Sequence, residues 1–109
     1  MKTIATARIQ GPEAIGDAKI VQLDNGNYQL QLVNFWVAPG APDVQIVFSE
    51  DANGVIAEHN IRFIAKLPSG NFSQHFPIDH LEDLDKMKTL LVYCKQFFVH
   101  FGHGSLQLL

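Results

Sequence analysis

Cysteine is nearly absent from this sequence: Cys94 is the only one among 109 residues. A single thiol excludes an intramolecular disulfide, a zinc site built from several thiolates, a Cys-x-x-Cys redox pair and covalent attachment of a c-type haem. Four roles remain for it, namely core packing, a reactive thiol, an axial ligand or half of an intermolecular bridge. Any redox chemistry by a thiol of this chain must therefore run through Cys94.

Charged residues are also scarce. They make up 17% of the chain, below the usual quarter, whereas 47% of the residues are hydrophobic. This balance excludes intrinsic disorder, which requires few apolar residues and much charge. The formal net charge is −3, and the Lys and Arg residues are scattered singly. We therefore expect neither nucleic acid nor an anionic membrane surface as a partner.

Long apolar runs are missing as well. None approaches the roughly 20 residues needed to span a bilayer, so the sequence predicts no transmembrane segment. Residues 1–8 lack the apolar stretch of a secretory signal peptide. The length fits one domain. We assign residues 14–109 to that domain and residues 1–13 to an N-terminal extension.

What the chain does contain is a series of short apolar segments separated by turn residues. Asn25-Gly26 suits the positive φ angles of a two-residue type I′ hairpin turn, which would pair Leu23 with Tyr28. About eight such segments alternate in polarity, which predicts an all-β fold, an antiparallel β-sandwich. One short helical turn is expected near residues 80–88, capped by Asp79. The long helices of a parallel α/β fold are not predicted.

In the segment that follows Asn25-Gly26, the apolar residues switch from one face of the predicted strand to the other. The alternation of apolar residues reverses before Phe35, which predicts a bulge, or burial of both faces, near Phe35-Trp36. Trp36 has the opposite parity to Phe35, so we expect it to be partly exposed and select it as the candidate partner-contact residue. Phe97, Phe98 and Phe101 are expected in the core rather than beside a flat cofactor.

The segment 90–94 is almost continuously apolar, as in a strand covered on both faces. A tight turn at Lys95-Gln96 would pair Cys94 with Phe97. In that register His100 points to the opposite face, and His103 lies roughly 20 Å from Cys94 at about 3.3 Å per residue. We therefore expect no metal site that combines Cys94 with these histidines.

A catalytic reading rests on Asp79 and His80, which could activate Cys94 as the nucleophile of a hydrolase. No oxyanion hole is indicated, and no phosphate-binding loop or pair of carboxylates is present. The sequence therefore favours a role other than that of an enzyme for this chain on its own.

One ordered set of residues resembles the DM-thirteen domain family over about residues 14–108. The set consists of Gly26, Leu30, Phe35, Ala41-Pro42-Asp43-Val44, Gly70, Phe76-Pro77, Val92-Tyr93-Cys94-Lys95, Phe97, Val99, Phe101-Gly102 and Leu106. The most specific parts are the strand that runs into Cys94-Lys95 and the Pro42-Asp43 pair. Ala41 and Phe76 depart from the glycine and tyrosine that are usual in the family.

This resemblance implies an electron-transfer domain in which Cys94 acts as a bare thiol or as a haem ligand. Haem is compatible with the family's inferred role, but nothing in this sequence requires it. The resemblance also implies a location outside the cytoplasm and a redox or cell-surface protein as partner. The alternative is a non-catalytic binding or scaffold module outside the cytoplasm, with Cys94 as core packing. The first reading requires that electrons or a ligand can reach the sulfur of Cys94.

Overall fold

The computed structural model describes residues 1–53, 60–79, 81 and 84–109. These residues contain nine strands and one 3-10 turn, and no helix long and apolar enough to cross a bilayer is found among them. The elements are β1 Lys2–Ile9, β2 Ala14–Gln22, β3 Tyr28–Val37, β4 Val44–Ser49, β5 Ile61–Lys66, β6 Gly70–Ile78, η2 Leu84–Lys86, β7 Thr89–Cys94, β8 Val99–Ser105 and β9 Gln107–Leu108.

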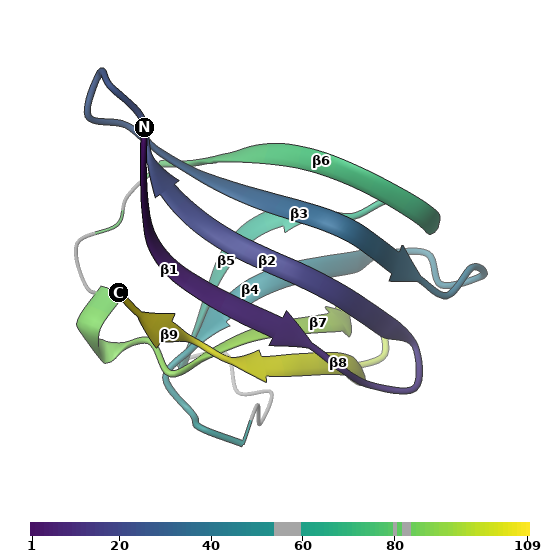
Figure 1. The fold of residues 1–109 in the computed structure, drawn as a ribbon. Helices are drawn as coiled ribbons and strands as arrows, with labels where there is room; N and C mark the ends of the chain where they lie inside the picture. Colours follow the sequence, from purple (N-terminus) through teal and green to yellow (C-terminus); the bar gives the residue numbers. More distant parts are fainter. Residues whose placement is uncertain (54–59, 80, 82–83) are drawn as a thin grey trace.

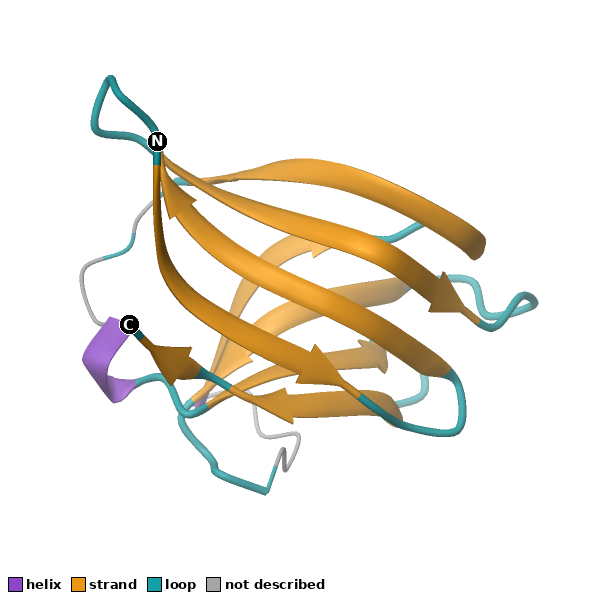
Figure 2. Ribbon diagram, in the orientation of Figure 1, coloured by secondary structure: helices purple, strands orange, loops and turns teal. Residues whose placement is uncertain are grey.

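The strands form two antiparallel sheets that lie face to face (Figure 1). One sheet has the order β6-β3-β2-β1-β9, and the other has the order β5-β4-β7-β8. Strands account for most of the ribbon, and the 3-10 turn η2 lies in the region where a helical turn was predicted (Figure 2). The predicted all-β sandwich is therefore confirmed. Part of the predicted capping motif, His80 and residues 82–83, lies outside the described residues.

The core lies between the sheets and is made by inward-facing residues of both. Ile20 and Leu30 from one sheet, and Leu90 and Val92 from the other, are fully buried in it. The opposite face of β7 is buried too, because its outward-facing residues pack in a second, smaller cluster with Val47 and Ile61. Burial on both faces explains why β7 is apolar along almost its whole length.

The first residues of the chain form part of this sandwich. β1 pairs with β2 along its length and with β9 near Ala5 and Thr6. Ala5 and Ile9 are fully buried in the main core. The residues that we placed in an N-terminal extension therefore include an interior strand of the larger sheet.

The first hairpin forms about the predicted turn, but in a different register. The N–H of Leu23 donates to the carbonyl oxygen of Asn27 (2.8 Å), and the N–H of Gly26 donates to that of Leu23 (2.9 Å). Asp24 to Gly26 thus make a three-residue loop with Gly26 at a positive φ of 89°. The predicted Leu23–Tyr28 pair was wrong, because a two-residue loop shifts every pair by one residue; Tyr28 pairs with Gln22.

The predicted phase change in β3 is a bulge. The pairing of β3 with β6 shifts between Leu32 and Phe35, and Asn34 has a positive φ of 49°. The N–H of Asn34, which leaves the ladder there, donates to the side-chain oxygen of Ser73 (2.9 Å). The bulge returns Phe35 to the core, where its side chain is fully buried.

The last hairpin also differs from the predicted register. Its loop is residues 95–98, and Cys94 pairs with Val99 instead of Phe97. Phe97 and Phe98 are 62% and 53% exposed, so the expectation that they belong to the core was wrong, whereas Phe101 is buried as expected. Lys95-Gln96 lacks the glycine or asparagine that a two-residue turn needs, and the longer loop places Phe98, at a positive φ of 51°, in the turn.

Candidate functional site

Cys94 is the last residue of β7, at the end of the ladder. It pairs with Val44 on β4 and with Val99 on β8. Its side chain is only 2% exposed and belongs to the main hydrophobic core together with Val44 and Val92. In this closed conformation the sulfur therefore lies among hydrocarbon groups.

Asp43 makes hydrogen bonds and an ion pair at the end of the sandwich where Cys94 lies. Its carbonyl oxygen accepts a hydrogen bond from the N–H of Lys95 (2.8 Å). Its carboxylate accepts one from the amide of Gln45 (3.2 Å) and lies 3.8 Å from the ammonium nitrogen of Lys66. The sequence shows Pro42-Asp43 only as a turn, because the contacts with Lys66 and Lys95 join segments that are far apart in the chain. Asp43 is thus a positioning residue for the strand end that carries Cys94.

Only a short loop separates this strand end from solvent. All of residues 95–98 are exposed, and Val99, the partner of Cys94 on the edge strand β8, is 46% exposed. The aromatic rings of Phe97 and Phe98 are therefore exposed on the loop that directly follows Cys94. This apolar loop is the nearest surface through which another molecule could approach Cys94.

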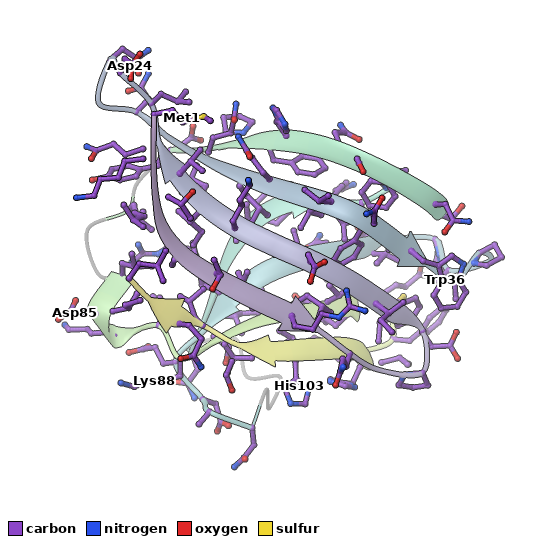
Figure 3. All side chains as sticks on the ribbon, viewed as in Figure 1. Met1, Asp24, Trp36, Asp85, Lys88 and His103 are labelled. Atoms are coloured by element: carbon purple, nitrogen blue, oxygen red, sulfur yellow. The ribbon has the colours of Figure 1, made fainter. Side chains whose placement is uncertain are left out.

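Trp36 lies near the end of β3, at the same end of the sandwich as Cys94. The chain runs from Val37 through a turn to Val44, which pairs with Cys94. The ends of β3 and β7 accordingly lie on one side of the molecule (Figure 1), and Trp36 is found there (Figure 3). Its side chain is half-buried against the main core, as the change of parity indicated.

The surroundings of Cys94 do not fit a haem. A surface cavity of about 210 Å³ is lined by Tyr93 and Lys95, the residues on either side of Cys94 in the chain. These neighbours of Cys94 alternate with it along the strand, so the cavity lies on the opposite face of the sheet. Cys94 does not line that cavity, and its sulfur is packed among core side chains. We therefore derive no role for haem at this residue.

Two histidines come together on β8, away from Cys94. The Nε2 atom of His100 lies 2.8 Å from the Nδ1 atom of His103. They share a face because β8 carries a bulge at Phe101: His100 pairs with Tyr93, whereas Gly102 pairs with Val92. Strict alternation places residues three apart on opposite faces, so the sequence alone does not indicate this pair.

The remaining histidines lie elsewhere or outside the described part of the chain. His75 is exposed on β6, whereas His59 and His80 are among the residues not described. The hypothesis of a nucleophile activated by Asp79-His80 therefore lies partly outside the described residues. Within them, no group of three or more His, Cys, Asp or Glu side chains could hold a metal ion.

Burial lowers the pKa of His100, and the neighbouring His103 lowers it further. The folded-state pKa then lies below the ordinary value of 6.5, so the unfolded chain binds the proton more readily. We expect the contribution of His100 to stability to be complete above about pH 6.5 and to be lost as the pH falls below it. Urea unfolding at pH 8 and pH 5.5 should show a larger loss of unfolding free energy for the wild type than for His100→Gln. Equal losses would contradict the assignment.

The geometry thus defines a class of protein: a small β-sandwich domain with one thiol at the end of an inner strand. A family model described as electron transfer DM13 matches residues 10–106, nearly the whole chain. The protein belongs to this electron-transfer family, as the residues around Cys94 and Pro42-Asp43 predicted. No curated protein and no solved structure matches the chain.

Proposed function

We propose that this domain transfers electrons through the thiol of Cys94, and that it does so from an opened state of the loop 95–98. Membership of the electron-transfer family supports the function. The place of Cys94 supports the route, because the residue ends its strand and is followed by exposed residues. The 2% exposure of the side chain is the reason that opening is required.

The chemistry that a single thiol can perform is thiol–disulfide exchange. The thiolate of Cys94 attacks one sulfur of a partner disulfide, forms a mixed disulfide and releases the other sulfur as a thiolate. A second thiol, from a partner because this chain has no other, then attacks the mixed disulfide and restores the Cys94 thiolate. Two electrons pass from the second thiol to the first disulfide, and the proton of Cys94 is given up before the attack.

Exposed aromatic residues at the same end of the domain suit the docking of a protein partner. Phe97 and Phe98 lie on the loop itself, and the partly buried Trp36 lies at the same end of the sandwich. Aromatic side chains are enriched in protein interfaces. We place Trp36 and this loop in the contact with a redox or cell-surface partner. The resemblance to the family supports a location outside the cytoplasm, where disulfides persist.

The second candidate is a non-catalytic binding or scaffold module. The burial of Cys94 in the main core favours it, because most buried cysteines only pack. In this case the same docking surface would be used, and the thiol would take no part. The two candidates differ in whether the thiol can be reached without unfolding of the whole domain.

The rate at which a thiol reagent labels Cys94 separates these candidates. We expect native protein to react slowly but with a rate that is nearly independent of urea at low concentrations, because local opening exposes little surface. Asp43→Ala keeps the backbone bond to Lys95 but removes the part-buried hydrogen bond from Gln45, which holds the segment that carries this backbone bond, and should raise the labelling rate about fivefold, which corresponds to about 1 kcal/mol. Labelling by an aromatic disulfide, followed by absorbance, measures this rate.

Asp17→Ala is the matched control for this experiment. Asp17 is also an aspartate in an ion pair, with Arg8 at 3.1 Å, but it lies on β2 in the other sheet. Its removal should change the labelling rate less than about twofold, since exposed ion pairs contribute little. If the labelling rate of every variant instead follows urea with the full slope of global unfolding, Cys94 is core packing and the binding module is the better description.

A further inference from the structure

The pair of histidines on β8 is the most specific chemical arrangement outside the Cys94 region. The Nε2 atom of His100 and the Nδ1 atom of His103 are 2.8 Å apart, and the ring centroids are 5.0 Å apart. Both side chains are half-buried. In the metal-free protein the two nitrogens share one proton in a hydrogen bond, since a neutral imidazole offers one donor and one acceptor.

The backbone holds both residues in place. His100 pairs with Tyr93 and His103 with Leu91, so both lie on the face of β8 that is turned away from the main core. Figure 3 shows His103 on that side of the strand. The N–H and the carbonyl oxygen of His103 are both hydrogen-bonded to Gln10 (3.1 Å each), so two bonds hold its backbone in place. A pair on such a strand is preorganised for a ligand.

We propose that His100 and His103 chelate a divalent first-row transition-metal ion, Cu²⁺ in preference to the others. Nitrogen ligands lie about 2.0–2.1 Å from such ions, so two nitrogens that meet the metal at a right angle are about 2.9 Å apart. The observed separation of 2.8 Å is close to this value. Binding therefore requires the rings to turn toward a common point, with little change in their separation.

The chemistry of the two ligands selects the ion. Imidazole suits copper, nickel and zinc, and affinity for divalent ions is highest at Cu²⁺ in the first-row order. A nitrogen separation near 2.9 Å is that of two ligands at a right angle, as in the tetragonal geometry of Cu²⁺, whereas the tetrahedral geometry of Zn²⁺ holds its ligands farther apart. A metal binds neutral imidazole, which is the prevailing form of an ordinary histidine above about pH 6.5. When the metal binds, the shared proton passes through water to the other nitrogen of the same ring, so that both imidazoles stay neutral and both facing nitrogens are free to act as ligands.

The site is separate from the thiol. Cys94 faces the main core, whereas the two imidazoles lie on the opposite face of the same sheet. Within the described part of the chain no third His, Cys, Asp or Glu completes the ligand set. Water or a group from a bound partner would therefore fill the other positions on the ion. This inference goes beyond the proposed function and does not depend on it.

Titration of the full chain with Cu²⁺ at pH 7.5 tests the site. We expect one ion to bind, with the nitrogen hyperfine pattern of two imidazoles in its electron paramagnetic resonance spectrum. His100→Gln and His103→Gln should each weaken binding at least about tenfold, because each variant keeps only one of the two ligands. His75→Gln is the matched control, since His75 is an exposed histidine on the other sheet, and it should bind as the wild type does.

A second measurement needs no variant. In the nuclear magnetic resonance spectrum of the wild type, a small amount of Cu²⁺ should broaden the imidazole signals of His100 and His103 before those of His75. Broadening of His75 first, or binding within about twofold of the wild type in the variant that lacks both histidines, would overturn the proposal. Either result leaves the labelling of Cys94 unaffected, so the two proposals fail separately.

Discussion

A chain with Gly104→Ala is expected to lose about 3 kcal/mol of unfolding free energy, at the upper end of the usual cost of overpacking. A Cβ atom at this position would lie 2.1 Å from the carbonyl oxygen of Arg8 and 2.7 Å from its carbonyl carbon. Both are backbone atoms, so β1 and β8 must move apart to make room. Urea unfolding followed by circular dichroism measures the loss.

Ser105→Ala is the control for this prediction. This substitution also introduces an alanine, at the residue of β8 that follows Gly104. Because Ser105 is exposed, the unfolding free energy of the Ser105→Ala chain should stay within about 0.5 kcal/mol of the wild type. A Gly104→Ala chain as stable as this control would mean that β1 and β8 are not so close in solution. The movement should also disturb the backbone hydrogen bonds between Gln10 and His103, because Gln10 lies two residues after Arg8 and His103 directly precedes Gly104.

This contact explains why the edge of the smaller sheet was not predictable. The glycine that follows His103 indicates only a turn or a weak strand in the sequence. In the fold it allows β8 to approach a strand of the other sheet, about ninety residues earlier in the chain. Such an approach depends on how the two sheets pack against each other. The alternation of polar and apolar residues within one segment carries no information about that packing.

The strands themselves were predictable because the two faces of each strand differ in polarity. The alternation predicted the strand that holds Leu30, and the reversal before Phe35 predicted a bulge or burial of both faces, of which the structure has the bulge. Register at the turns was not predictable from composition, since Asn25-Gly26 suits both a two-residue and a three-residue loop. A shift of two residues in the last hairpin, from Phe97 to Val99, then decided which residue opposes Cys94 on β8.

The candidate site was predictable only in part. Resemblance to a family and the single thiol pointed to Cys94, and the parity of Trp36 predicted its partial exposure. The burial of Cys94 depends on β4, β8 and the opposite sheet, so the sequence could not decide it. The pairing of His100 with His103 required the bulge between them, for which no glycine or proline at position 101 gave a signal.

The second large effect is expected at Phe35, the residue that the bulge in β3 turns into the core. Its side chain is fully buried, and its ring packs against that of Phe72 with centroids 5.6 Å apart and planes at 50°. Phe35→Ala removes the ring and leaves a cavity beneath the larger sheet, so we expect a loss of about 3–5 kcal/mol in unfolding free energy. Thermal and urea unfolding measure it.

Val33→Ala is the matched control, because Val33 stands on the other side of the same bulge and is 37% exposed. It should lose less than about 1 kcal/mol, since little apolar surface becomes uncovered. A loss for Phe35→Ala no larger than that of Val33→Ala would show that the bulge does not direct Phe35 inward. The same pair of variants bears on partner docking, because Trp36 follows Phe35 directly and owes its partly buried position to the same reversal of parity.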